Sequence, residues 1–450
     1  MKLSPALCLI PVFLAPALFA QESVSYHKQI RPILMRQCQG CHQPASKQSD
    51  LLLTTFDGLK AGGRKGPAFV PGSPEKSVLI SYLTGEATPR MPFGAPPLPN
   101  DQIDLFRAWI REGAKNDSPP EAAAADAPQA PQAYNAPPVI HALAISPDAK
   151  LIAVSGYYEI LLHQMGQGLV ARLPGLSDRI HSLMFSPDGK TLAAVGGSPG
   201  RFGEVQVWDM ESRKQRHSLV LTNDTLFGGA LSPDGKRLAM GAADKSIRVV
   251  DVETGKEIRK MDHHEDWVFG AAFGIDGKRL VTVGRDRAAK LTDAETGRFV
   301  ENVNLLKEPL AAVVRHPRKD WVVIGGEERV PYLYMMDRPR AMRIADDSTL
   351  IRKFEPQDGP ILSLAVSADG KYIAVGSALG DVRIYDLETG EAAGKCSGHR
   401  GGIYTIQFFP DGKRLAAAGF DGNVRVYDVT GKLETAFVPV PLEKPVVAQK

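Results

Sequence analysis

The chain contains little cysteine and no excess of charge of one sign. Only four of its 450 residues are cysteine, too few for a protein of this size to be held together by a disulfide framework. Lysine and arginine together number 54 against 51 aspartates and glutamates, which argues against electrostatic binding to nucleic acid. After the N-terminal region no run reaches the roughly 18 apolar residues of a membrane helix, so we expect no span in the mature chain.

The sequence also lacks the short motifs that usually identify an enzyme. It has no hydrolase elbow between a strand and a helix, no H-E-x-x-H zinc motif and no phosphate-binding glycine loop. It has no cluster that resembles a catalytic triad either. We therefore expect a protein that binds or carries something and has no catalytic activity of its own.

The first 20 residues have the composition of a secretory signal peptide. One lysine precedes an apolar run that ends in Leu18-Phe19-Ala20. We expect cleavage after Ala20, and hence an exported protein located in the periplasm or elsewhere outside the cytoplasm. The mature chain then keeps Cys38, Cys41 and Cys396, of which Cys396 has no obvious partner and is expected to be a buried or tolerated free thiol.

The remainder divides by composition into two domains and a linker. Residues 21–115 contain helical segments and Gly/Pro-rich loops, which predict a small all-α domain. Residues 116–137 are rich in alanine and proline and have almost no large apolar side chain, which predicts an extended linker. Residues 138–441 consist of short β-branched runs, and residues 442–450 are expected to form a C-terminal tail.

The β-rich region is a repeat of one phrase, an apolar run, Ser-Pro-Asp-Gly-Lys and a second apolar run. Seven copies begin near residues 139, 179, 225, 267, 309, 360 and 402. Their spacing of about 40 to 50 residues is the period of a four-stranded propeller blade, so we predict an all-β, seven-bladed propeller. The last copy is followed by its own fourth strand, KLETAFVPV. We therefore expect all four strands of the seventh blade to come from the C-terminus.

These copies resemble the WD-repeat family over roughly 300 residues. Trp208-Asp209 is the literal WD pair, and Tyr385-Asp386 and Tyr427-Asp428 stand at equivalent places. In the last copy the resemblance implies a structural hydrogen-bonded tetrad of His399, Thr405, Asp421 and Tyr427. The fifth copy, with ERVPYLYMMDR and an insertion, departs most from the pattern.

The helical domain contains the motif Cys-Gln-Gly-Cys-His, from Cys38 to His42. A structural zinc site usually needs four ligands, and apart from this motif the domain offers only the distant His27. A thioredoxin-like redox pair should lie between a strand and a helix, whereas the preceding segment is predicted to be helical. A structural disulfide would close so short a loop that it would stabilise little.

The fourth interpretation accounts for the whole motif. In C-x-x-C-H, the thiols of Cys38 and Cys41 form thioethers with the two haem vinyl groups, and His42 becomes the proximal iron ligand. The motif therefore predicts one covalently attached haem c. Attachment takes place outside the cytoplasm, which agrees with the predicted signal peptide.

A second axial ligand is expected from the loop ATPRMPFGAPPLP, where the thioether of Met91 is favoured. His27 and an open iron position are the alternatives. Met35 lies only three residues before the attachment site and is expected to pack in the core.

The whole stretch from about residue 24 to 114 is similar to the planctomycete-type cytochrome c domain. The resemblance rests on IRPIL, CQGCH, the Met91 loop and the closing segment WIREGA. It implies that Met91 is the distal ligand, although this loop has Met91-Pro92-Phe93 where the family usually has Met-Pro-Pro. The longer segment LPNDQIDLFRAWIREGA predicts an amphipathic helix with Trp109 near the porphyrin and an apolar stripe that also contains Ile103, Phe106 and Ile110.

Alignment of the first strand of each copy predicts a ring of side chains at one mouth of the propeller channel. The aligned residues are His141, His181, Phe227, Phe269, Ala311, Leu362 and Tyr404. A mixture of aromatic and histidine side chains without net charge is typical of a protein-contact site. The alternative is that these residues simply fill the channel.

Together these features predict an exported mono-haem cytochrome that transfers single electrons and docks an unidentified redox partner through its propeller. One alternative is a haem-containing scaffold or sensor in which the propeller is the main binding module. The other is an oxidoreductase with a substrate site in the propeller channel.

Overall fold

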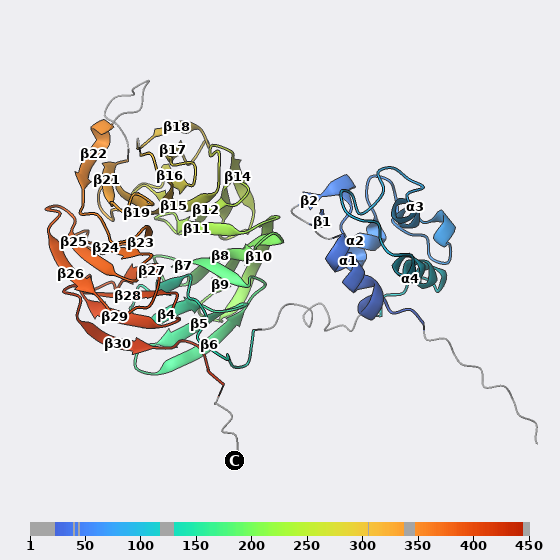
Figure 1. Ribbon diagram of the computed structural model, residues 1–450, viewed down its shortest axis with the longest axis horizontal. Coiled ribbons are helices and arrows are strands. Elements are labelled where there is room, and N and C mark those ends of the chain that lie inside the picture. The colour runs from blue at the N-terminus through green and yellow to red at the C-terminus, as the bar shows by residue number, and fades with distance from the viewer. Residues whose placement is uncertain are drawn as a thin grey trace, which may run out of the picture. The chain divides into compact units, whose positions relative to one another are not determined.

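The computed structural model describes residues 23–38, 41–43, 46–117, 130–304, 306–336 and 347–443 (Figure 1). The described chain forms a helical unit followed by a β unit, and each is considered by itself. The predicted signal peptide lies outside the described residues, as do residues 118–129 of the predicted linker and most of the C-terminal tail.

The helical unit consists of short helices joined by turns, with one small two-stranded sheet. Hydroxyl groups cap two of the helices, because Ser25 Oγ accepts from Lys28 N (2.9 Å) and Thr55 Oγ1 accepts from Gly58 N (3.0 Å). The elements are η1 (Tyr26–Ile30), α1 (Arg31–Gln37), β1 (His42–Gln43), β2 (Ser46–Lys47), η2 (Gln48–Asp50), α2 (Phe56–Ala61), η3 (Pro74–Lys76), α3 (Val78–Thr84) and α4 (Asn100–Arg111).

Helix α4 supplies the centre of this unit's core. Its stripe of Ile103, Phe106, Trp109 and Ile110 is buried, as the amphipathic pattern predicts. The same core includes Ile30 and Leu34 from η1 and α1, and Leu59 from α2. A single apolar cluster therefore joins both ends of the helical unit.

The β unit consists of seven four-stranded antiparallel sheets, so the predicted seven-bladed propeller is confirmed (Figure 1). The first blade consists of β3 (Leu143–Ile145), β4 (Leu151–Ser155), β5 (Glu159–Gln164) and β6 (Gly168–Pro174). The second consists of β7 (Arg179–Phe185), β8 (Thr191–Ser198), β9 (Phe202–Asp209) and β10 (Lys214–Thr222). The third consists of β11 (Leu226–Leu231), β12 (Arg237–Ala242), β13 (Ile247–Asp251) and β14 (Glu257–Met261). The fourth and fifth are β15 (Val268–Phe273), β16 (Arg279–Gly284), β17 (Ala289–Asp293) and β18 (Phe299–Asn302); and β19 (Leu310–Arg315), β20 (Trp321–Gly326), β21 (Tyr332–Met335) and, after the short helix η4 (Asp347–Thr349), β22 (Leu350–Lys353). The last two are β23 (Ile361–Val366), β24 (Tyr372–Ser377), β25 (Val382–Asp386) and β26 (Ala392–Cys396); and β27 (Ile403–Phe408), β28 (Arg414–Gly419), β29 (Val424–Asp428) and β30 (Leu433–Phe437).

The repeated Ser-Pro-Asp-Gly-Lys phrase forms the turn between the first two strands of a blade. In the second blade Ser186 Oγ donates to Asp188 Oδ1 (2.5 Å), and the same carboxylate oxygen accepts from Lys190 N (3.0 Å). Gly189 has a φ of 71°, a left-handed conformation that glycine adopts without steric cost. The same serine–aspartate bond recurs in three further copies, at Ser146/Asp148, Ser232/Asp234 and Ser367/Asp369.

The seventh blade takes all four strands, β27 to β30, from the C-terminal part of the chain, as predicted. The ring is therefore closed by side chains and not by a shared strand. Thr405 Oγ1 accepts from Leu143 N (3.1 Å), and Gln407 Oε1 accepts from Ile145 N (2.9 Å). These bonds join the innermost strand of the last blade to that of the first.

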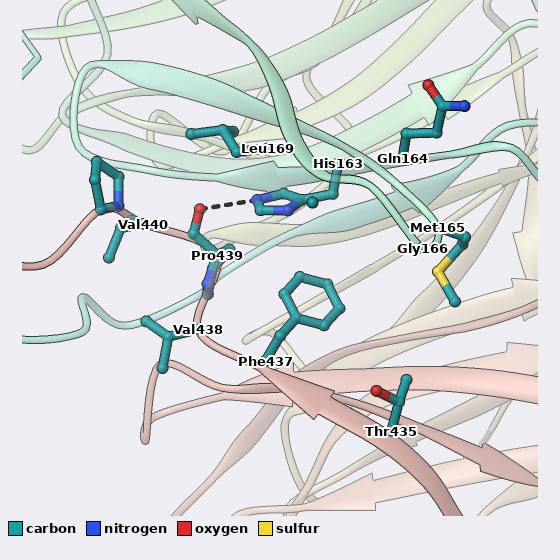
Figure 2. A pocket seen from close by; sticks show the side chains of 12 residues that line it. His163, Gln164, Met165, Gly166, Leu169, Thr435, Phe437, Val438, Pro439 and Val440 are labelled. Atoms are coloured by element: carbon teal, nitrogen blue, oxygen red, sulfur yellow. Dashed lines mark hydrogen bonds between the residues drawn. The ribbon is translucent and has the colours of Figure 1, made fainter.

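The segment after β30, residues 438–443, provides a second closure, which we term the clasp. His163 Nε2 in β5 donates to the carbonyl of Pro439 (2.8 Å), and the His163 ring lies 5.0 Å from that of Phe437 (Figure 2). An apolar cavity of about 420 Å³ lies between the clasp and the β5–β6 hairpin. The clasp thus attaches the end of the seventh blade to the first blade.

The last part of the predicted linker packs on the propeller and continues this closure. Tyr134 is 7% exposed, and its backbone N–H donates to Pro441 O (2.8 Å). Its hydroxyl donates to the buried carboxylate of Glu159 (2.7 Å), which also binds the guanidinium of Arg172 (2.6 Å). Residues 130–137 therefore belong structurally to the first blade, although their composition is that of a linker.

The hydrogen-bonded tetrad expected in the seventh blade is not formed, so that prediction is wrong. Thr405 bonds across to the first blade, and the Tyr427 hydroxyl donates to Ser397 O (2.6 Å). His399 Nδ1 lies 3.9 Å from Asp421, and its buried Nε2 has no hydrogen-bond partner among the described residues. From the strand register, we expect the residue of β28 that faces His399 Nε2 to be Ala417, whose side chain has no hydroxyl to bond the ring.

The fourth blade contains the network that the seventh lacks. His264 Nδ1 donates to Asp286 Oδ1 (2.9 Å), and His264 Nε2 is 2.8 Å from the hydroxyl of Thr282. Thr282 is the fourth residue of β16, as Ala417 is of β28. The hydroxyl at the fourth residue of a blade's second strand therefore determines whether the histidine Nε2 of that blade has a hydrogen-bond partner.

Candidate functional site

The attachment motif lies at the end of α1, where the backbone turns back on itself. Cys38 N continues the helix by donating to Leu34 O (2.9 Å). The carbonyl of Cys38 then accepts from both Cys41 N (3.2 Å) and His42 N (3.1 Å). This turn brings the three motif residues together within one short loop.

The two thiols differ in their surroundings, and both are free in the described chain. Cys38 is half-buried against the helical core, whereas Cys41 is exposed. Burial, reinforced by the neighbouring Cys41, raises the pKa of Cys38 to about 12. A redox-active pair requires a thiolate with a lowered pKa, so this environment does not favour a redox pair. No group of three or more side chains suited to a metal ion occurs among the described residues.

His42 lies next to the thiols with a largely buried ring, 8% exposed. Burial lowers the pKa of His42, and the nearby backbone carbonyls of Leu51 and Gln48 offset part of that effect. Its Nδ1 is buried and has no hydrogen-bond partner of good geometry in the described structure. A neutral imidazole near backbone carbonyls is the form that binds iron through one nitrogen and donates a proton from the other. The residues of the motif therefore fit a covalently attached haem.

Met91 contacts the same apolar cluster as Cys38, and its backbone N–H donates to Tyr82 O in α3 (2.9 Å). Its loop is rich in proline, and the Thr88–Pro89 and Met91–Pro92 peptide bonds are both cis. Met35 is 39% exposed, so the expectation that it packs in the core is wrong. His27 is half-buried at the opposite end of the helical segment, where its backbone N–H donates to Asp117 Oδ1 (2.9 Å).

Trp109 is part of an aromatic cluster that the sequence analysis did not identify. Its ring lies 5.1 Å from Phe69 and 5.6 Å from Tyr26, and Phe56 contacts all three rings. The indole N–H donates to Lys115 O (3.0 Å), which satisfies its polar atom. These aromatic residues are far apart in the chain and have no common period, so no local pattern indicates the cluster.

The propeller encloses a central cavity of about 1100 Å³, lined by the innermost strand of every blade. All seven residues of the predicted ring line it. Their aromatic and imidazole rings follow one another at 5.4 Å (Tyr404–His141), 5.1 Å (His141–His181), 5.3 Å (His181–Phe227) and 5.2 Å (Phe227–Phe269). The structure thus brings the aligned positions side by side, and each is half-buried.

A break in strand register explains why these positions face the same way. The innermost strands β7, β15, β19, β23 and β27 each have a bulge at the ring residue, and β11 has a longer irregularity there. A bulge redirects a side chain relative to the alternating pattern of a strand. The sequence alignment located these positions without showing that a bulge orients them.

The ring is uncharged at neutral pH. Burial, with help from nearby charge, lowers the pKa of His141 and takes that of His181 to about 3. The structure adds Trp267, which is 38% exposed, 5.8 Å from Phe227 and covered by the guanidinium of Arg285 at 4.5 Å. This tryptophan precedes its strand and so fell outside the aligned positions.

Two family models match the chain. Residues 38–93, from the first motif cysteine to just beyond Met91, match the planctomycete cytochrome C model. Residues 255–293, 348–386 and 390–428 match the WD domain, G-beta repeat. Each WD match runs from the outermost strand of one blade to the third strand of the next, as β14 to β17 in the first case.

Two curated relatives match only part of this chain. An uncharacterized WD repeat-containing protein of Schizosaccharomyces pombe is 36% identical over 83 residues, which are 18% of this chain and 12% of that protein. An uncharacterized WD repeat-containing protein of Synechocystis is 27% identical over 101 residues, 22% of this chain and 28% of the relative. The matches therefore cover a minor part of each relative's length.

Fold, site and family matches define a c-type cytochrome domain joined to a β-propeller. A region that matches the planctomycete cytochrome c family is followed by WD repeats that form a seven-bladed propeller. The family of the first domain implies haem, and that of the second implies a protein-binding surface. No helix in the described ranges is long and apolar enough to cross a membrane.

Proposed function

We propose that this protein is an exported mono-haem c-type cytochrome that transfers single electrons and does not act as an enzyme. The observation that carries the proposal is the Cys38–His42 loop, which combines two free thiols with a buried, neutral imidazole. When bound, haem supplies an iron that alternates between its ferric and ferrous states.

The residues of the loop have separate roles in this proposal. Cys38 and Cys41 would hold the porphyrin through thioethers, and His42 would bind the iron as proximal ligand. The carbonyls of Gln48 and Leu51 would accept the proton on the nitrogen that does not bind iron, which orients the ring. The apolar core around α4 would exclude water from the cofactor.

Met91 is proposed as the distal ligand. Its side chain packs on the cluster that also contacts Cys38, and its thioether is a soft donor that stabilises ferrous iron and raises the potential. A haem with both axial positions filled suits electron transfer. An open position would suit a sensor that binds a small gas, and this is the alternative function.

The propeller is proposed to dock a protein redox partner through the channel mouth formed by the ring and Trp267. The mouth is aromatic, uncharged and half-exposed, which is typical of the central part of a protein interface. An oxidoreductase with a substrate in the channel is the remaining alternative, and it predicts substrate turnover by the haem-loaded chain.

The test uses the full chain produced in a host that exports it and attaches haem. The expected product carries one haem that survives denaturation, and Cys38→Ser with Cys41→Ser should abolish it, whereas Cys396→Ser should not. Oxidised protein should show the weak near-infrared band of methionine–iron ligation, and reduced protein should resist carbon monoxide. A colourless product refutes the cytochrome proposal. Ready binding of carbon monoxide by the wild type refutes simple electron transfer and supports the sensor.

A further inference from the structure

The last residue of each innermost strand occupies an equivalent position in all seven blades. Each pairs with the second residue of the next strand, as Arg315 pairs with Val322 and Phe185 with Leu192. Six of the seven residues are apolar: Ile145, Phe185, Leu231, Phe273, Val366 and Phe408. The seventh is Arg315, so one blade places a cation where every other blade places a hydrocarbon.

Arg315 lines the central cavity, four residues further along β19 than the ring residue Ala311. At about 3.3 Å per residue, this puts it roughly 13 Å deeper toward the other mouth. Phe185, Leu231 and Val366 line the same cavity. The guanidinium therefore enters a region whose equivalent positions are apolar.

The guanidinium of Arg315 has no hydrogen bond or ion pair with any described residue. Burial lowers its pKa, and only the distant charge of Asp320 acts in the opposite direction. Asp320 is itself exposed, and its carboxylate accepts from the backbone of Ile275 (3.1 Å). Among the described residues that line the cavity, Glu327 is the only acidic one; it is exposed and follows β20 at the end where the ring lies.

A partly buried guanidinium without a counter-charge is unfavourable, because the interior solvates it less well than water and returns no ion pair. An anion that enters the cavity would supply that missing interaction. Guanidinium binds carboxylates through two parallel hydrogen bonds, and the apolar side chains around it would bury a hydrocarbon body. Gln407 also lines the cavity, and its amide N–H₂ has no partner among the described residues.

We propose that the propeller channel is a binding site for a carboxylate with an apolar body, whose carboxylate group pairs with Arg315. The ligand is either a small aromatic or aliphatic carboxylic acid or the C-terminal carboxylate of a peptide with an apolar last residue. The site does not depend on haem, so its test is independent of the proposed electron transfer.

The test measures binding to the full haem-loaded chain by titration calorimetry and by the shift in melting temperature. The probes are 4-phenylbutyrate and the peptide acetyl-Gly-Leu-Phe with a free C-terminus. Each has a neutral counterpart, namely 4-phenylbutanol and the C-terminal amide. A response to the small acid alone assigns a metabolite-like ligand, and a preference for the peptide acid assigns a chain terminus.

Arg315→Met is the decisive variant, because it restores the apolar residue type of the other blades. It should keep or raise the melting temperature and weaken carboxylate binding at least about tenfold, as expected for loss of a charged hydrogen bond. Arg315→Lys keeps the charge but not the planar fork and should bind with intermediate affinity. Arg318→Met, at an exposed arginine of the adjacent turn, should bind as the wild type does.

The proposal is overturned if Arg315→Met binds the acids as well as the wild type does, or if the neutral counterparts bind equally well. It is also overturned if neither acid binds. Should Arg315→Met fail to fold, Arg315→Lys provides the test. If this variant binds both acids and both neutral counterparts with wild-type affinity, pairing with the guanidinium is refuted.

Discussion

Replacement of Asp286 by alanine should destabilise the propeller by about 3 to 5 kcal/mol, the usual cost of removing one partner from a buried ion pair, here with Lys290 Nζ at 3.4 Å. Asp286 is 7% exposed at its side chain and bonds His264 Nδ1 at 2.9 Å and the backbone of Glu265 at 3.0 Å. Its loss leaves the fully buried His264 without its acceptor. Thr282 would then hold only the other ring nitrogen.

The pH dependence of the same carboxylate gives an independent magnitude. Burial alone would raise the pKa of Asp286, but the hydrogen bonds from His264 and Glu265 outweigh it and bring the value from 3.8 to about 2. That difference corresponds to about 2 kcal/mol of stability. Because the folded pKa is the lower one, this contribution is present above about pH 4 and is lost as the pH falls toward 2.

The assay is urea unfolding of the full chain, followed by the circular dichroism of the strands. Glu265→Gln is the matched control, since that exposed neighbour makes no side-chain bond in the described structure and should change stability by less than about 0.5 kcal/mol. Asp286→Asn keeps the shape and should lose about 2 kcal/mol at pH 7. A stability of Asp286→Ala within 1 kcal/mol of the control, or a difference that does not shrink in acid, would refute the argument.

Three further predictions concern the closure of the ring and the haem ligand. Ala417→Ser should stabilise the seventh blade by about 1 kcal/mol in thermal unfolding, because the new hydroxyl can satisfy buried His399 Nε2; a decrease in stability would contradict the register argument. His163→Phe should lower stability by about 1 to 2 kcal/mol through loss of the 2.8 Å bond to Pro439 O, and chemical denaturation that shows no change would mean that the clasp does not hold the ring. Met91→Ala should abolish the near-infrared band and allow carbon monoxide to bind the reduced haem, whereas Met35→Ala should do neither.

The parts of the fold that repeat could be predicted from the sequence, because each copy contains its own turn chemistry. Asp188 and Gly189 define one hairpin locally, and five of the seven copies have the same Asp-Gly pair at this turn. The Cys38–His42 motif is equally local, since its residues lie within one turn of backbone. In both cases the residue types and their spacing were sufficient to predict the local structure.

The features that could not be predicted depend on partners far apart in the chain. Tyr134 looks like part of an Ala/Pro-rich linker, and only Glu159 and the clasp explain its burial. Thr405 was assigned to a tetrad because the sequence does not show that its hydroxyl is used across the ring closure. The position that should carry the hydroxyl for His399 is Ala417 in β28, the strand next to that of Thr405, and only the strand register identifies it.

The same comparison of copies indicates where this propeller differs from a purely structural one. The second strand of each blade is buried almost throughout, and its residues are small or β-branched because they pack on both faces. The innermost strands also place some side chains along the cavity, and these can change from blade to blade with little loss of packing. There the copies carry histidine, phenylalanine, leucine, alanine and tyrosine at the ring, and a single arginine deeper in the channel. The stability of the fold alone does not account for an unpaired cation at that position, whereas a ligand that pairs with it does.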